Sequence, residues 1–111
     1  LNGAFYKQTF SPQEKADILT NTELNAKVFI LSRAEIDAYL PTHFRSAKAT
    51  EYAVAQGIQV AENGNSCWWI RNDEENSGRA FPMLSTGVVG QSLYVTNDFV
   101  GVRPAIWVTI E

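Results

Sequence analysis

The chain has 111 residues, enough for a single domain with one hydrophobic core. Apolar residues make up 45% of it and aromatic residues 12%, which is typical of a folded globular protein, and no apolar run approaches the roughly 20 residues that cross a bilayer. The formal net charge is −3 and the Lys and Arg residues are scattered, which argues against a positive surface for nucleic acid.

The first third of the chain predicts two short helices. One is expected over residues 2–8. The other begins at Ser11, whose side chain can cap a helix, with Pro12 at the first helical position and Glu14 completing a capping box. We expect this second helix to continue to about Leu19. Its expected apolar face consists of Ala16, Ile18 and Leu19.

The middle of the chain predicts a buried strand followed by two helices. Residues 27–31 are apolar and mostly of types that favour strands. Ser32 and Glu35 repeat the capping-box pattern, and the helix that they start must stop before Pro41. A further helix is expected over residues 50–56, with a glycine directly after it. The expected apolar face of the helix after Ser32 consists of Ile36, Tyr39 and Leu40.

The last third of the chain predicts strands. They are expected over residues 67–71, 80–85, part of 88–95, and 102–110. Thr86 and Gly87 have turn chemistry, as does Gly90, while Pro82 and Pro104 restrict their strands to edges, starts or bulges. Helices followed by strands predict an α+β fold, in which the helices of the N-terminal half pack on a C-terminal antiparallel sheet.

Two runs in the second half carry a family resemblance. The chain contains Trp-Trp-Ile-Arg at residues 68–71 and Gly-Val-Arg-Pro-Ala at residues 101–105. With these runs it resembles, over essentially its whole length, a widespread bacterial and phage family of uncharacterised domains. Members usually have a further segment before the equivalent of Leu1, so the resemblance implies that residues 1–111 are the C-terminal two-thirds or more of one longer α+β domain. Many members continue the first run with Ser-Pro, where this chain has Asn72 and Asp73.

The family in turn resembles C-type lectin-like folds, including the formylglycine-generating-enzyme type. Those folds also end in an arginine-bearing strand after a tryptophan-bearing strand. The resemblance implies a C-type lectin-like arrangement, and domains of that kind often sit on bacterial surfaces or phage particles and bind proteins or sugars. The family has no established activity, and similarity of fold does not transfer function.

The three tryptophans are large enough to dominate either a core or a binding face. Neighbours on a strand point to opposite faces, so one of Trp68 and Trp69 is expected to face the core. We assign Trp68 and Trp107 to the aromatic core and Trp69 to a face that can stack on a sugar or contact a protein. The alternative is that the sheet covers one of Trp68 and Trp69 and the helices cover the other.

Two arginines, Arg71 and Arg103, lie at the end of one predicted strand and the start of another. They can clamp an anion or a carboxylate, or they can form structural ion pairs with Glu51 or Glu35. We take Arg71 as a candidate for ligand binding, and Arg103 and Glu51 as structural.

Two pairs of polar residues are further candidates for ligand binding. Residues 72–76 gather side-chain oxygen atoms of the kind that Ca²⁺ prefers, but they match no EF-hand pattern and no signature of calcium-dependent lectins. Asn72 and Asp73 therefore stand as ligand-binding candidates, with Asn97 and Asp98 as a weaker pair and a solvated loop as the alternative. No metal and no cofactor is expected, and folding is expected not to require Ca²⁺.

The sequence carries no catalytic motif. Cys67, the single cysteine, is expected to be a buried thiol beside the tryptophans, because the only histidine, His43, is distant in sequence. One cysteine and one histidine also rule out a disulfide or a Cys/His zinc site within the chain. No phosphate loop, dinucleotide fingerprint or nucleophile elbow is present, so we do not expect an enzyme.

The sequence therefore favours a non-catalytic binding module of a bacterial surface, secreted or phage-related protein. Its expected ligand is a glycan or a protein, and its expected location is extracellular or at the cell surface. The alternative is a structural or assembly domain whose aromatic residues all belong to the core. Neither nucleic acid nor membrane insertion is expected, and nothing in the sequence indicates an oligomeric state.

Overall fold

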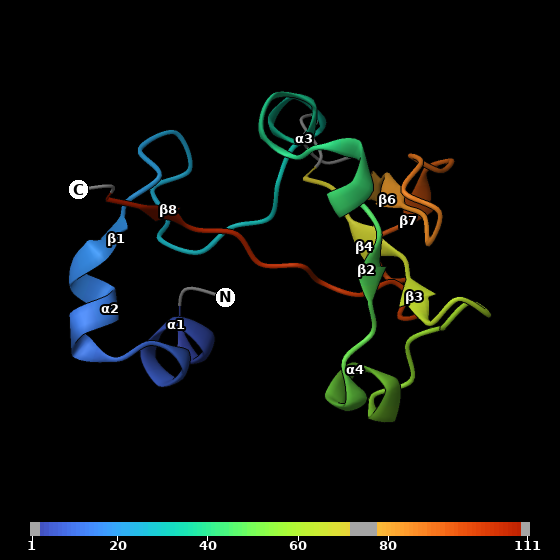
Figure 1. Ribbon diagram of the computed structural model, residues 1–111, viewed down its shortest axis with the longest axis horizontal. Coiled ribbons are helices and arrows are strands. Elements are labelled where there is room, and N and C mark those ends of the chain that lie inside the picture. Colours follow the sequence, from blue (N-terminus) through green and yellow to red (C-terminus); the bar gives the residue numbers. More distant parts are fainter. Residues whose placement is uncertain (1–2, 72–77, 110–111) are drawn as a thin grey trace. The chain divides into compact units, whose positions relative to one another are not determined.

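The computed structural model describes residues 3–71 and 78–109. It divides into two compact units, Leu1–Ile30 with Pro104–Glu111 and Leu31–Arg103. The first unit contains α1 (Ala4–Thr9), α2 (Pro12–Asp17), β1 (Ile18–Leu19) and β8 (Trp107–Val108) (Figure 1). The second unit contains α3 (Arg33–Tyr39), the 3₁₀ helix η1 (Thr42–Phe44), β2 (Ala47–Lys48), α4 (Glu51–Ala55), β3 (Asn65–Ser66), β4 (Trp68–Trp69), β5 (Arg79–Ala80), β6 (Pro82–Met83) and β7 (Leu93–Tyr94). The fold is α+β, as predicted.

In the first unit, the predicted capping box of α2 is confirmed. Ser11 Oγ accepts the Glu14 backbone N–H at 3.1 Å, and Glu14 Oε1 accepts the Ser11 N–H at 2.8 Å. The helix ends at Asp17, two residues before the predicted end, because Ile18 is extended and starts β1. Of the predicted apolar face, which was expected to be buried in part, Ile18 is buried and Leu19 is 48% exposed. Ala16, on the same predicted face, is also exposed.

The sheet of the first unit joins residues that are far apart in the sequence. β1 pairs antiparallel with β8, with Ile18 opposite Val108 (Figure 1). The predicted strand over residues 27–31 is reduced to one antiparallel bridge between Phe29 and Ala105, whose two hydrogen bonds measure 3.0 and 2.7 Å. Phe29 is buried, as the prediction of an apolar strand implied, and its ring centroid lies 6.1 Å from that of Trp107.

The two α-helices of the second unit begin where the sequence predicted. The α3 capping box at Ser32 is present, and α4 is capped by Thr50 Oγ1, which accepts the Ala53 N–H at 3.1 Å. After α4 the chain turns at Gly57 with φ of +99°, a conformation that favours glycine. Of the predicted apolar face, Ile36 is buried, but Tyr39, the last residue of α3, is 64% exposed. Among the described residues, no helix is both long and apolar enough to cross a membrane.

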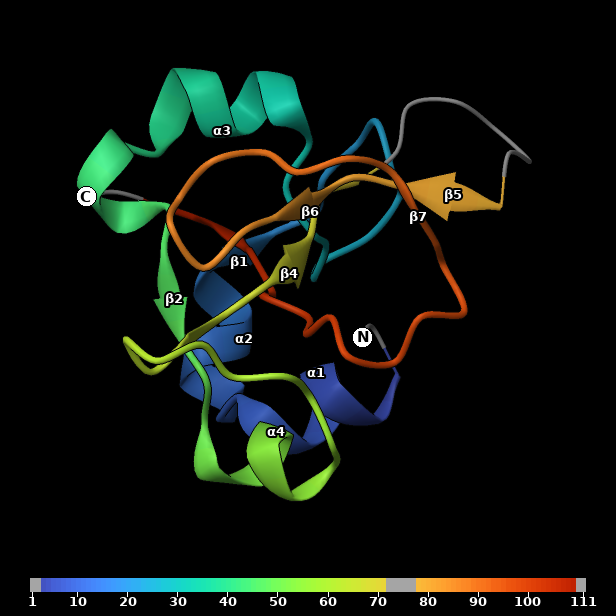
Figure 2. The same ribbon diagram turned by 90° about the vertical axis from the view of Figure 1, so that its right-hand side faces the viewer.

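The strands of the second unit are shorter than predicted. They form three separate antiparallel pairs, β2 with β3, β4 with β6, and β5 with β7. Figure 2 shows the β4–β6 pair beside the β5–β7 pair. Pro82, opposite Trp69 in the β4–β6 pair, has no N–H to donate, which helps to keep that pair short. A tight turn follows β6, where Gly87 has φ of +86° and its N–H donates to Leu84 O at 2.9 Å, as the Thr86-Gly87 pattern predicted.

The core of the second unit is built on α3, β4 and β6. Trp68 and Ile70 alternate with the half-buried Trp69 along the chain, as expected for a strand with one face turned to the core. The buried cluster consists of Ile36, Trp68, Ile70 and Met83, and the partly buried residues packed against it are Leu31, Leu40, Ala47 and Val89.

Candidate ligand-binding groove

The second unit has an open groove along β5, β7 and the loop after β7. Its volume is about 520 Å³. The residues that line it are Arg79, Leu93, Tyr94, Thr96, Asn97, Asp98 and Phe99. We call this surface the Tyr94 groove.

One side of the Tyr94 groove is fixed by the β5–β7 pair. Antiparallel pairing places Arg79 opposite Tyr94, and the guanidinium carbon lies 4.4 Å from the centroid of the tyrosine ring. Arg79 also donates to Ser92, from Nε to Oγ at 3.2 Å and from a terminal nitrogen to the carbonyl at 2.7 Å. The arginine is therefore held in place, and it covers one face of the Tyr94 ring.

The other side of the groove is a tight loop. Asn97 N–H donates to Tyr94 O at 3.0 Å, and Asn97 Oδ1 accepts the Phe99 N–H at 3.1 Å. The side-chain oxygen of Asn97 is therefore occupied. The Asn97 Nδ2 group and the exposed Asp98 carboxylate have no hydrogen bond or ion pair to the described residues. Tyr94 is 64% exposed and Phe99 52%. The groove thus presents two aromatic rings, one amide donor and one carboxylate.

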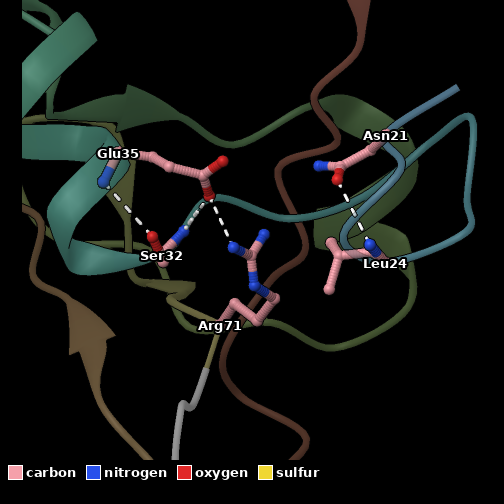
Figure 3. Close-up of polar contacts among 5 residues, drawn as sticks. All are labelled: Asn21, Leu24, Ser32, Glu35 and Arg71. Atoms are coloured by element: carbon pink, nitrogen blue, oxygen red, sulfur yellow. Dashed lines mark hydrogen bonds and ion pairs between the residues drawn. The ribbon is translucent and has the colours of Figure 1, made fainter. Parts of the chain in front are cut away.

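A separate polar network joins the start of α3 to the end of the tryptophan-bearing strand. Glu35 Oε1 accepts the Ser32 N–H at 2.8 Å, which closes the capping box, and lies 2.9 Å from a terminal nitrogen of Arg71 (Figure 3). The side chains of Glu35 and Arg71 are 17% and 18% exposed, so the ion pair is largely buried. The Arg71 N–H also donates to Leu31 O at 2.7 Å. The Glu35 carboxylate therefore contacts both the N-cap residue of α3 and the arginine that follows β4.

The arginine of the second run, Arg103, has a different kind of partner. One of its terminal nitrogens donates to Phe44 O at 2.9 Å, and its guanidinium carbon lies 5.0 Å from the centroid of the Trp68 ring. Trp68 Nε1–H in turn donates to Arg45 O at 2.9 Å. Burial lowers the pKa of Arg103 from its ordinary value. Arg103 and Trp68 thus both hold the chain at the end of η1.

Replacing Arg103 with alanine is expected to lower the free energy of unfolding by about 2 kcal/mol, because it removes a charged hydrogen bond and a cation–π contact. Arg103→Lys keeps the charge but loses the planar group, and should recover less than half of that loss. Urea unfolding of both variants measures the effect. An unchanged midpoint for Arg103→Ala would show that the arginine is dispensable for folding.

A domain of unknown function, DUF6273, matches residues 1–110 of the chain. The chain belongs to the DUF6273 family. No curated protein matches it, and neither does any solved structure. The DUF6273 match includes residues of both units, and it covers the tryptophan-bearing strand as well as the run that contains Arg103.

Two of the ligand-binding candidates predicted from the sequence meet in the Tyr94 groove of this DUF6273 chain. They are Asn97 and Asp98. Trp69 is half-buried in β4, outside the residues that line the groove. Arg71 forms the ion pair with Glu35 that the sequence offered as the alternative to an anion clamp. The predicted candidates Asn72 and Asp73 lie outside the described residues.

The residues assigned to structural roles in the DUF6273 chain fall in different places. Trp68 is buried in the core of the second unit, while Trp107 is half-buried beside Phe29 in the first. Glu51 is exposed in the first turn of α4, so the structural partner of Arg71 is Glu35 and not Glu51.

The predicted burial of Cys67 needs correction. The thiol-bearing residue is half-buried rather than fully buried, and it lines a cavity of about 240 Å³ with Ser66 and Ser85 among others. His43 is exposed and its ring centroid lies 4.2 Å from that of Phe44. Among residues 3–71 and 78–109 of the DUF6273 chain, no three His, Cys, Asp or Glu side chains could hold a metal ion together.

The sequence candidates did not include five of the described residues that line the groove, namely Arg79, Leu93, Tyr94, Thr96 and Phe99. Tyr94 and Phe99 bracket the Asn-Asp pair within six residues, and two aromatic residues around a polar turn are a usable signal for a binding loop. Nothing local identifies Arg79, because only the β5–β7 pairing of the DUF6273 chain brings it to the same place.

Proposed function

We propose that the chain is a non-catalytic binding module and that the Tyr94 groove is its ligand site. The observation that carries the proposal is the combination, in one groove, of two exposed aromatic rings with the amide of Asn97 and the carboxylate of Asp98. Binding sites for small ligands and peptides commonly combine aromatic surface with a few polar groups that fix orientation. The absence of a catalytic motif from the sequence is why no reaction is part of the proposal.

The exposure of the aromatic rings supports a binding role. Tyr94 is 64% exposed and Phe99 52%, so much of their surface faces water in the free protein. Aromatic residues dominate the energetics of interfaces because they bury a large area with few rotatable bonds. Arg79 already holds one side of the Tyr94 ring, which lowers the entropy that a ligand must remove.

The proposed ligand is a glycan or a protein. We place the module on a bacterial surface, in a secreted protein or in a phage-related protein, as the resemblance in the sequence suggested. A remote relationship to C-type lectin-like folds belongs to the same proposal.

Replacing Tyr94 with alanine is expected to weaken ligand binding at least about tenfold, because the main apolar contact is lost. The measurement is binding of the purified chain to a glycan array and to surface proteins separated from bacterial envelopes. Tyr52→Ala is the matched control, since Tyr52 is 75% exposed and does not line the groove. Equal binding by Tyr94→Ala and wild type would show that this groove is not the ligand site.

A structural or assembly domain is the second candidate, and exposed apolar residues outside the groove favour it. Val88 is 61% exposed, Val102 57% and Phe81 47%. Such residues can contact neighbouring subunits or a further part of the same assembly. A blank in every binding experiment, together with concentration-dependent self-association in sedimentation velocity, would favour assembly over ligand binding.

A further inference from the structure

The apolar part of the Tyr94 groove is suited to a flat partner with C–H groups on one face. Arg79 covers one face of the Tyr94 ring, so the exposed area lies on the other face and the edges. Phe99 adds a second exposed ring to the same groove. A pyranose ring carries such a face of C–H groups, which packs against an aromatic ring.

The polar part of the groove offers one donor and one acceptor from adjacent residues. Asn97 Oδ1 is engaged by the Phe99 N–H, so the side chain has its Nδ2 group left to donate. The Asp98 carboxylate can only accept. A hydroxyl group both donates and accepts, so two neighbouring hydroxyls of a sugar match this pair, one accepting from Asn97 and the other donating to Asp98.

The groove holds one positive and one negative group, and the negative group, Asp98 in the loop after β7, disfavours an acidic ligand at that position. The Arg79 guanidinium is directed to Ser92 and to the Tyr94 ring, whereas the Asp98 carboxylate is exposed. A ligand carboxylate or sulfate at the loop would meet a like charge. An uncharged ligand avoids this like-charge repulsion.

We propose that the Tyr94 groove binds an uncharged pyranose through stacking on Tyr94 and Phe99 and through two neighbouring hydroxyls held by Asn97 and Asp98. This inference rests on the proposed function and specifies its ligand class. It assigns the loop after β7, and not the tryptophan-bearing strand, as the sugar-binding element.

The test uses two substitutions that keep the size of the side chain. Asn97→Asp retains an oxygen to accept the Phe99 N–H but replaces the Nδ2 donor, and Asp98→Asn removes the charge. The probes are neutral oligomers of glucose, galactose, mannose and N-acetylglucosamine, and acidic oligomers of galacturonic acid together with sialylated and sulfated glycans. We expect wild type to bind a neutral probe, and each substitution to weaken that binding about tenfold or more.

Matched controls separate the groove from general effects of these substitutions. Asn63 also accepts a backbone N–H two residues ahead through Oδ1, at 2.9 Å from Asn65 N, so Asn63→Asp makes the corresponding change elsewhere, and it also removes the Nδ2 donor of a 3.4 Å hydrogen bond to Ser85 O. Glu62→Gln removes one exposed negative charge outside the groove. Both controls should bind the neutral probe like wild type.

The outcomes separate this inference from the proposed function. Acidic probes that bind more tightly than neutral ones and are lost in Tyr94→Ala would overturn the ligand class and leave the groove as the site. A protein ligand whose binding is lost in Tyr94→Ala, with no glycan bound, would also overturn the ligand class and leave the groove as the site. Binding of any probe that survives Tyr94→Ala would overturn both, and so would the absence of any ligand.

Discussion

Replacing Trp68 with alanine is expected to lower the free energy of unfolding by about 3–5 kcal/mol, a larger loss than we expect for Arg103→Ala. The side chain is 2% exposed and packs with Ile36, Ile70 and Met83. Its Nε1–H also donates to Arg45 O, so truncation leaves a cavity and deprives that carbonyl of its donor. The Trp68 ring is also the surface on which the Arg103 guanidinium rests.

Urea unfolding measured by circular dichroism tests this expectation, with two variants for comparison. Trp68→Phe retains much of the packing but loses the indole N–H, and is expected to cost about 1–2 kcal/mol. Trp69→Ala truncates the half-buried neighbour on the same strand and should cost less than Trp68→Ala. A loss below about 1 kcal/mol for Trp68→Ala would contradict the central place of Trp68 in this core.

The second large effect is expected at Glu35. Glu35→Ala should lower the free energy of unfolding by about 2–3 kcal/mol, because it removes the carboxylate half of the capping box and leaves Arg71 largely buried without its carboxylate. Arg71→Gln should cost a similar amount, because it leaves the Glu35 carboxylate largely buried without its cation. The double variant should cost less than the sum of the two, because both remove the same pair.

The chain contains its own control for the Glu35 experiment. Glu14 occupies the same capping-box position at the start of α2, but it is exposed, and no ion pair to it occurs among the described residues. Glu14→Ala should therefore cost about 1 kcal/mol or less, because it removes one exposed hydrogen bond of the capping box and leaves the Ser11 cap in place. Equal losses for Glu14→Ala and Glu35→Ala in thermal and urea unfolding would mean that the ion pair with Arg71 contributes nothing.

Local signals in the sequence predicted the helices well. Both capping boxes, at Ser11 and Ser32, act within four residues, so their geometry is visible in the sequence. The early end of α2 was not predictable, because Ile18 leaves the helix to pair with Val108, which lies close to the other end of the chain. Pairing across such distances depends on tertiary structure and overrides helical propensity.

Only the residues of the groove that carry a local signal were predicted from the sequence. Asn97 and Asp98 stood out because amide and carboxylate side chains in a turn are a local feature. Arg79 reaches the groove only through the register of β5 with β7, and its contact with Tyr94 has no counterpart in the sequence pattern. The exposure of Tyr94 could not be predicted either, because a tyrosine in an apolar run is as consistent with burial.

The two arginines at the end of the tryptophan-bearing strand and the start of β5 have a consequence for sequence change in this family. Arg71 is tied to Glu35 and to Leu31, while Arg79 is tied to Ser92 and rests on Tyr94. Arg71 thus ties its part of the chain to α3 and to Leu31, and Arg79 ties β5 to β7. These contacts share no partner, so a substitution at Arg71 leaves the Arg79 contacts in place and the reverse also holds, and the two positions can change independently of each other.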